Sequence, residues 1–167
     1  QKPFTEQELL VKVGKALGTD VTVLSTSERK RKDAERLGAF DFALTSQPET
    51  FTRLQRRFDF ILDTVSAPHN YNDYVNLLKT DGTMILVGVP DKPTLLEPFP
   101  LILHRRRIAG SVIGGIRETQ AMLDFCATHH IESDVEVIPI QQVNEAYERV
   151  LKGDVRFRFV IDLGSLK

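Results

Sequence analysis

The stretch Asp20-Val-Thr-Val-Leu-Ser-Thr-Ser27, followed by Glu28-Arg-Lys-Arg-Lys32, decides the expected fold. An apolar, β-branched run ends in hydroxyl side chains, and a basic segment with helical composition begins directly after it. In a parallel α/β sheet, anionic ligands bind where a strand ends and the next helix starts. Hydroxyls and lysines at that point suit a phosphate group, whereas a free ribose diol usually meets an Asp or Glu. The stretch therefore predicts a site for a 2′-phosphorylated dinucleotide.

Helical and strand-like stretches alternate on both sides of this stretch, which is typical of an α/β fold with a mainly parallel sheet. Residues 90–100 contain four prolines and are expected to form an irregular excursion. The expected helices cover residues 5–17, 27–37, 71–78, a segment through Met122 and Phe125, and 143–151. The expected strands cover residues 21–24, 40–44, 58–65, 83–89, 107–113, 135–138 and 158–163, with a turn at Asp81-Gly82.

Composition places the chain among ordinary soluble globular proteins. It has 167 residues, of which 41% are hydrophobic and 27% charged, with a formal net charge of −1. This balance gives no reason to expect a nucleic acid or an anionic membrane as partner. No apolar run approaches the roughly 20 residues of a membrane span. Cys126 is the single cysteine, so no internal disulfide can form and a reducing cytoplasm is the expected compartment.

Several further segments, in this order and spacing, resemble the cinnamyl alcohol dehydrogenase branch of the zinc-type, medium-chain alcohol dehydrogenases. Each segment alone is a weak signal, but together they run through most of the chain. They are Lys15-Ala-Leu-Gly18, Val21-Thr-Val-Leu-Ser-Thr-Ser27, Asp63-Thr-Val65, Asp81-Gly-Thr83, Leu86-Val-Gly-Val-Pro90, Arg107-Ile-Ala-Gly-Ser-Val-Ile-Gly-Gly115, Glu118-Thr-Gln120, Leu123-Asp-Phe-Cys126, Asn144-Glu-Ala-Tyr-Glu-Arg149 and Lys152-Gly-Asp-Val-Arg-Phe-Arg-Phe-Val-Ile-Asp162.

The resemblance implies a Rossmann domain and an oxidoreductase reaction. Members of this family reduce aldehydes or oxidise primary alcohols with NADP(H), and a zinc-bearing catalytic domain surrounds their Rossmann domain. Residues 1–114 are then expected to form an incomplete NADP-binding Rossmann domain with helices on both faces of a parallel sheet. Residues 115–167 are expected to form the C-terminal segment that packs on the catalytic domain in relatives.

The glycine loop and first strand of a Rossmann domain have no counterpart in these residues. The family's glycine positions fall on Lys2, Phe4, Thr5 and Gln7, where side chains would occupy the space that a pyrophosphate needs. The first strand is central in the order 3-2-1-4-5-6, so its neighbours would have unpaired edges. Another chain, a rearranged sheet or a further segment of polypeptide could fill its place.

The zinc-binding half of the family also lacks a counterpart here. Neither Cys126 nor any of the four histidines matches a ligand position of the family; these are His69, His104, His129 and His130. One cysteine excludes a four-cysteine structural zinc cluster. We therefore expect no catalytic or metal-binding residue in this chain, no turnover by the chain alone, and weak or lost NADP binding. The catalytic half would be a separate partner. The alternative is a truncated, nucleotide-free remnant that acts only as an oligomeric structural or binding module.

The expected cofactor site begins at the hydroxyl-rich strand end. Ser25 takes the place of the ribose-binding acid, and Thr26, Ser27 and Lys30 provide donors for a 2′-phosphate, with Arg29 as a less certain second donor. A structural reading competes with this one. In it Ser27 merely caps the following helix, and residues 29–32 form a solvated basic face.

The resemblance assigns further residues to the same cofactor. They are Thr64, Val65, Val87, Gly88 and Val89 along the ribose and nicotinamide groove, and Ser111, Val112 and Ile113 beside the carboxamide. Arg158, or alternatively Arg156, would approach the pyrophosphate. Two competing readings assign no cofactor contact. In them the residues along the groove are simply the ends of strands, and the arginine is an exposed residue at a strand edge.

Residues 107–113 also predict a homodimer. In relatives the equivalent strand pairs antiparallel with its mate across a two-fold axis. Ile108, Ala109, Val112 and Ile113 form an apolar, β-prone run, and no charge after Arg107 blunts its edge. The alternative is a monomer in which residues 90–100 cover this edge.

Overall fold

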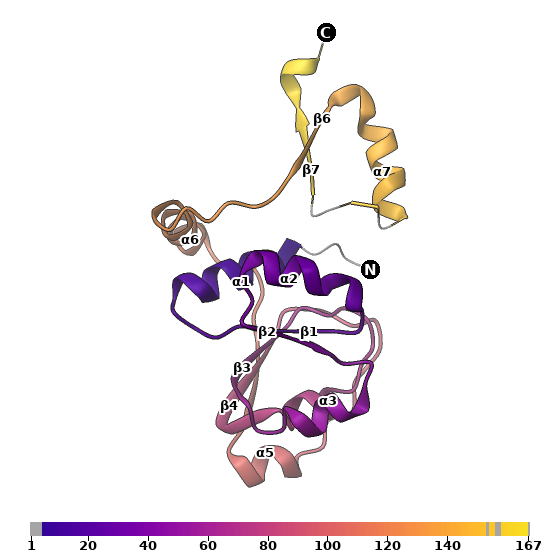
Figure 1. The fold of residues 1–167 in the computed structure, drawn as a ribbon. Helices are drawn as coiled ribbons and strands as arrows, with labels where there is room; N and C mark the ends of the chain where they lie inside the picture. The colour runs from indigo at the N-terminus through magenta and orange to yellow at the C-terminus, as the bar shows by residue number, and fades with distance from the viewer. Residues whose placement is uncertain (1–4, 153, 156–157, 167) are drawn as a thin grey trace.

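The computed structural model describes residues 5–152, 154–155 and 158–166, with side-chain surroundings from Leu10 onward. Helices and parallel strands alternate along these residues (Figure 1). The helices are α1 (Thr5–Ala16), α2 (Arg31–Leu37), α3 (Pro48–Arg53), α4 (Tyr71–Val75), α5 (Phe99–His104), α6 (Ile116–Thr128) and α7 (Val143–Leu151). The strands are β1 (Thr22–Ser25), β2 (Asp41–Leu44), β3 (Phe58–Asp63), β4 (Leu78–Leu86), β5 (Arg107–Gly110), β6 (Glu136–Pro139) and β7 (Phe159–Asp162). A short 3-10 helix, Glu28–Lys30, precedes α2, and two others are Ile140–Gln142 and Leu163–Ser165.

The strands form separate parallel sheets. One sheet pairs β1 with β2, a second has the order β3-β4-β5, and a third pairs β6 with β7. Every strand pairing among the described residues is parallel, and helices flank the sheets, so the expected α/β, Rossmann-like class is confirmed. The sheet is not rearranged to pair β1 with β3 among the described residues, and the expected position of the central strand lies between two separate sheets.

Two clusters of buried side chains hold the first five strands. One cluster joins both sheets on the side of α3 and α4: Ala43 of β2 packs with Ile61 of β3, Met84 of β4 and Val75 of α4. The other cluster lies on the opposite side, where Val11 of α1 and the α2 residues Ala34 and Leu37 pack on Val23 and Phe42. The first sheet therefore has helices on both faces, and only one cluster spans both sheets.

Ion pairs connect the C-terminal region to the first helices. Asp134, which precedes β6, lies 2.7 Å from Arg36 of α2 and 3.6 Å from Lys12 of α1. Apart from these contacts, β6 and β7 stand away from the other sheets in Figure 1, beyond α1 and α2. None of the described helices is long and apolar enough to cross a membrane.

Three expected strands differ from the structure by two or more residues at an end, and the others differ by one. The strand expected over residues 58–65 ends at Asp63, because the Asp63 side chain accepts a hydrogen bond from the Val65 amide and turns the backbone. The strand expected over residues 83–89 begins earlier and ends at Leu86. The expected turn at Asp81 is instead a bulge within β4, where φ is 63°. The strand expected over residues 107–113 ends at Gly110, because Gly110 pairs with Leu86, the last residue of its partner strand β4.

Two helices with proline near their start were not expected from the sequence. Helix α3 begins at Pro48, and α5 carries Pro100 in its first turn. Proline suits the first turn of a helix because that turn has no intrahelical partner for its amides. Helix α4 is also shorter than residues 71–78, since Leu78 already belongs to β4.

Candidate functional site

The expected site residues gather where the parallel strands end. Ser25 to Lys30 follow β1, Thr64 and Val65 follow β3, residues 87–89 follow β4, and residues 111–113 follow β5. Tyr74 of α4 shows that both sheets end on the same side. Its hydroxyl lies beside the side chain of Thr45, which follows β2, and its ring lies 5.4 Å from that of His69, which follows β3. Ligands of parallel α/β sheets bind at this carboxyl edge.

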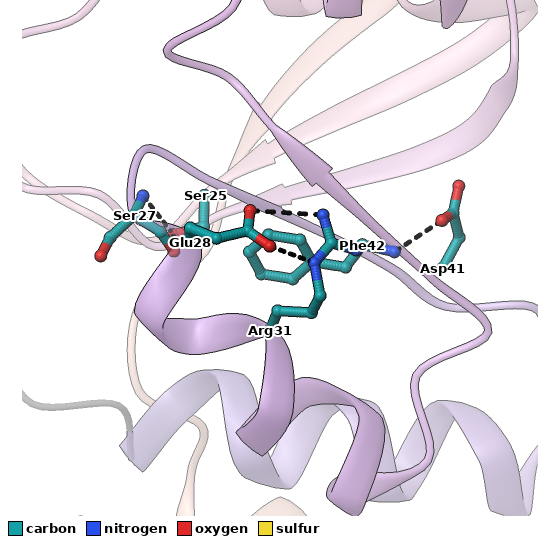
Figure 2. Close-up of polar contacts among 6 residues, drawn as sticks. All are labelled: Ser25, Ser27, Glu28, Arg31, Asp41 and Phe42. Atoms are coloured by element: carbon teal, nitrogen blue, oxygen red, sulfur yellow. Dashed lines mark hydrogen bonds and ion pairs between the residues drawn. The ribbon is translucent and has the colours of Figure 1, made fainter.

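The segment Ser25–Lys30, which we call the hydroxyl turn, is shaped by Ser25 (Figure 2). The Ser25 side chain is buried, and its Oγ accepts from the Ser27 amide at 3.2 Å and lies 3.4 Å from the Ser27 carbonyl oxygen. Ser27 precedes the 3-10 helix with extended backbone angles, but its side chain makes no capping hydrogen bond. Ser27 therefore occupies the expected N-cap position, but its side chain does not cap the helix, and the Ser25 side chain closes the turn instead.

The basic residues 29–32, at the end of the hydroxyl turn and just after it, have different surroundings. Arg29 and Lys32 are exposed, as a solvated face requires. Arg31, in contrast, does not belong to such a solvated face. It forms a two-pronged ion pair with Glu28, and its guanidinium lies 4.6 Å from the centre of the Phe42 ring. Lys30 is half-buried, and this burial lowers the pKa of its ammonium group. A nearby anion would offset that desolvation.

A small cavity adjoins the hydroxyl turn and was not anticipated from the sequence. It has a volume of about 250 Å³. Its lining includes Arg31 and Phe42, with Leu44 at the end of β2 and Thr50 and Arg53 of α3. The signal that could have revealed it is an arginine one helical turn after a strand end, opposite an aromatic residue of the next strand. The guanidinium and the ring together give it a flat, partly apolar wall.

Asp63 organises the loops that follow β3 and β4, where the ribose and nicotinamide groove is expected, although sequence reasoning gave Asp63 no role. The side chain is buried, and its Oδ1 accepts from the Val65 amide at 3.0 Å. Its Oδ2 lies 3.1 Å from Nε2 of His69, whose Nδ1 lies 2.9 Å from the carbonyl oxygen of Ala67. Both ring nitrogens of His69 thus face oxygen atoms, which fixes the ring. The loop that follows Thr64 is held by this one carboxylate.

Gly88 allows the loop after β4 to approach this groove closely. The amides of Val87 and Gly88 both donate to the Asp63 carbonyl oxygen, at 2.9 and 3.0 Å. A Cβ atom placed on Gly88 would lie 2.5 Å from the carbonyl oxygen of Val65. Val89 beyond it is 80% exposed, so an apolar side chain stands open at the groove.

The remaining expected residues divide into two groups. The Ser111 amide donates to the Leu86 carbonyl oxygen, which keeps residues 111–113 beside the end of β4, and Ile113 is 90% exposed. Arg158 lies instead just before β7 in the separate third sheet. Its backbone carbonyl accepts from Glu136, and its side chain is exposed. Arg156, Lys2 and Phe4 lie outside the described residues, while Thr5 and Gln7 belong to α1.

The donor set of the described residues does not fit a zinc ion. No group of three or more His, Cys, Asp and Glu side chains within them could hold a metal. Cys126 is buried, with its Sγ 3.7 Å from the Met122 sulfur, and the His129 ring packs 4.3 Å from the Phe125 ring. We therefore assign no zinc chemistry to these side chains.

Comparison with known proteins fixes the family. Residues 8–128, the larger part of the chain, match the family described as zinc-binding dehydrogenase. The chain belongs to this zinc-binding dehydrogenase family. This dehydrogenase-family chain is 53% identical over 157 residues to NADP-dependent alcohol dehydrogenase C 1 of Mycolicibacterium smegmatis, covering 94% of the chain and 45% of the relative. It is also 53% identical over 157 residues to aldehyde reductase YahK of Escherichia coli, covering 93% and 45%.

Solved structures agree with the resemblance in sequence. A cinnamyl alcohol dehydrogenase from Sorghum bicolor matches with a TM-score of 0.87 and 40% identity, over 96% of this dehydrogenase-family chain and 46% of that protein. A Helicobacter pylori enzyme solved in complex with NADP(H) matches with a TM-score of 0.77 and 34% identity, over 92% and 44%. The resemblance to the cinnamyl alcohol dehydrogenase branch is confirmed. The chain spans less than half the length of these relatives.

Proposed function

We propose that this chain is the cofactor-binding portion of an NADP(H)-dependent alcohol dehydrogenase, and that the hydroxyl turn binds the 2′-phosphate. The observation that carries the proposal is the end of β1, where Ser25, Thr26 and Ser27 stand with half-buried Lys30. The one carboxylate of the turn, Glu28, is engaged by Arg31 and therefore does not repel an anion. Relatives named as NADP-dependent enzymes support the same choice of cofactor.

The rest of the cofactor would follow the carboxyl edge. We propose that the adenine ring lies at the 250 Å³ cavity, against Arg31 and Phe42. The nicotinamide half would lie along Thr64, Val65 and the backbone of residues 87–89, with Ser111 and Ile113 beside the carboxamide. Arg158 remains a proposal for the pyrophosphate. NADP(H) supplies hydride chemistry when bound, and these residues position it.

Lys30→Ala is expected to weaken NADPH binding about tenfold or more while leaving NADH binding nearly unchanged. A hydrogen bond to a charged group contributes about 1.5–3 kcal/mol, and only NADPH carries the 2′-phosphate. Calorimetric titration with both cofactors measures the effect. Lys32→Ala is the matched control, because it removes the same charge from an exposed position two residues later, in α2. Equal losses in the two variants, or equal affinity of the parent for the two cofactors, would refute the assignment of the hydroxyl turn.

We expect the 167-residue chain alone to show no alcohol dehydrogenase turnover, with or without added zinc. Metal polarisation of the carbonyl contributes several kcal/mol of transition-state stabilisation, and the described side chains offer no metal site to supply it. An NADPH-coupled assay on aromatic and aliphatic aldehydes tests this expectation. Zinc-dependent turnover above background contradicts it. Absence of both turnover and NADPH binding would favour the alternative of a structural or binding module.

We also propose a homodimer through the edge of β5. This strand is the last in its sheet, and the apolar residues after it, Val112 and Ile113, are exposed. Ile113→Lys is expected to shift a dimer to monomer in light scattering, since a lysine blunts an exposed edge. Ile116→Lys, also highly exposed but within α6, is the control and should keep the parental mass. A parental monomer at tens of micromolar would contradict the dimer.

A further inference from the structure

An ion pair lies where the hydroxyl turn meets α2 (Figure 2). Glu28 is the first residue of the short 3-10 helix, and Arg31 is the first residue of α2. Nε of Arg31 donates to Oε1 of Glu28, and Nη2 of Arg31 donates to Oε2 at 3.3 Å. Both carboxylate oxygens of Glu28 are therefore engaged by one guanidinium, which is the strongest geometry for such a pair.

Phe42 of β2 holds the same guanidinium from a second side. Its ring is buried, and Cζ of Arg31 lies 4.6 Å from the ring centre, where the ring attracts a cation. Asp41 also acts on Arg31 through its charge, but Oδ1 of Asp41 accepts from the Phe42 amide at 2.7 Å. Within the part of the chain that the structure describes, Glu28 is thus the acid that binds Arg31 through hydrogen bonds.

This pair neutralises a carboxylate that would otherwise face the adenosine half of the cofactor. The Glu28 side chain is 57% exposed, and it lines the cavity of about 250 Å³ beside the hydroxyl turn. The hydrogen bonds from Arg31 lower the pKa of the Glu28 carboxyl, so the group is ionised at neutral pH. A free carboxylate at such a position accepts hydrogen bonds from a ribose diol, and it repels a phosphate.

We propose that Arg31 determines the cofactor preference of the hydroxyl turn by neutralising Glu28. Without that pairing, the same turn would bind the free ribose diol of NADH through Glu28 and repel the 2′-phosphate of NADPH. Arg31 is thus a positioning residue that acts through Glu28, whereas Lys30 and the hydroxyls bind the phosphate themselves. The inference rests on the assignment of the hydroxyl turn to the 2′-phosphate, and it adds what makes that turn selective.

The test compares adenosine 2′-monophosphate with adenosine, because the two probes differ only in the 2′-phosphate and neither needs a pyrophosphate contact. NMR titration of the 167-residue chain gives a dissociation constant for each probe, and their ratio measures the preference. Arg31→Gln should lower the preference for the 2′-monophosphate at least about tenfold, since it removes one positive charge and exposes one negative charge. Adenosine alone should bind Arg31→Gln as tightly as the parent or more tightly.

The double variant Glu28→Gln/Arg31→Gln separates charge from packing. Both it and Arg31→Gln lack the guanidinium on Phe42, but the double variant has the net charge of the parent and should recover its preference. Arg31→Lys keeps the charge and should also retain the preference. Lys32→Gln is the matched control, because it removes the same charge from an exposed position one residue later and should have a small effect.

Salt supplies a readout that a purely structural role would not change. At 1 M salt the Debye length is about 3 Å, so the difference between Arg31→Gln and the double variant should shrink. The pKa of the Glu28 carboxyl, followed by NMR, should rise in Arg31→Gln. Arg31→Leu, which keeps an apolar contact with Phe42, makes the same test if Arg31→Gln does not fold.

The outcomes separate this inference from the proposed function. A parent that binds both probes equally, or binds neither, refutes the assignment of the hydroxyl turn and this inference with it. A parent that prefers the 2′-monophosphate refutes the inference alone if Arg31→Gln keeps that preference or if the double variant does not recover it. An unchanged pKa of Glu28 in Arg31→Gln would likewise overturn the inference, because the pair would then be absent in solution.

Discussion

Asp63→Ala is expected to lower the free energy of unfolding by about 3 kcal/mol. The substitution leaves the Val65 amide and the His69 ring without their buried acceptor, and each such loss costs about 1–3 kcal/mol. Chemical denaturation followed by circular dichroism measures the change. The loop from Thr64 to His69 should also lose protection in hydrogen exchange.

Asp59→Ala is the matched control for this experiment. Asp59 lies on the same strand, but its side chain is exposed and pairs with exposed Lys79 at 2.7 Å. Exposed ion pairs contribute little, so the control should change the unfolding free energy by less than about 1 kcal/mol. Similar values for the two variants would show that the buried carboxylate does not organise the groove.

Gly88→Ala should destabilise the protein by about 1–3 kcal/mol, the usual range for overpacking. The added methyl group would lie 2.5 Å from the Val65 carbonyl oxygen and 2.8 Å from the Thr64 carbonyl carbon, which are backbone atoms and cannot turn away. The loop after β4 must then move outward, so NADPH affinity should fall together with the midpoint of thermal unfolding.

Gly110→Ala is the corresponding control, since a Cβ at that position meets no atom within 4 Å. Alanine in a strand is favoured over glycine by roughly 0.5–1 kcal/mol, so this variant should be as stable as the parent or slightly more stable. If Gly88→Ala matched it in both stability and cofactor affinity, the close approach of the two loops would have no energetic role.

Short-range sequence patterns predicted those helices and strands whose own residues determine where they begin and end. The apolar run before Ser25 and the glycine at position 38, which takes the left-handed conformation with φ of 96°, bound β1 and α2 as expected. The position of the hydroxyl turn at a strand end was predictable for the same reason. Its internal hydrogen bonds were not, because Ser25 and Ser27 are equivalent in a sequence pattern and differ only in burial.

Features that depend on distant residues were not predictable. The role of Asp63 requires His69 to fold back over Tyr71 and Tyr74, with ring centres 4.9 and 5.4 Å away. The bulge at Asp81 appears only when β4 is aligned with β3. The sequence also left open which strand lies beside β1 on its second edge, because several arrangements satisfy its apolar pattern. Among the described residues, β1 and β3 belong to separate sheets and do not pair.

The divided sheet has a consequence for how the protein opens. Among the first five strands, backbone ladders are confined within β1-β2 or within β3-β4-β5, and one side-chain cluster links the two groups. Cooperative opening units follow contiguous hydrogen-bonded structure. The group of α1, β1, α2 and β2 can therefore exchange its amides in a partial opening that leaves β3 to β5 intact. The architecture thus encodes a partly opened state that lies below global unfolding in free energy.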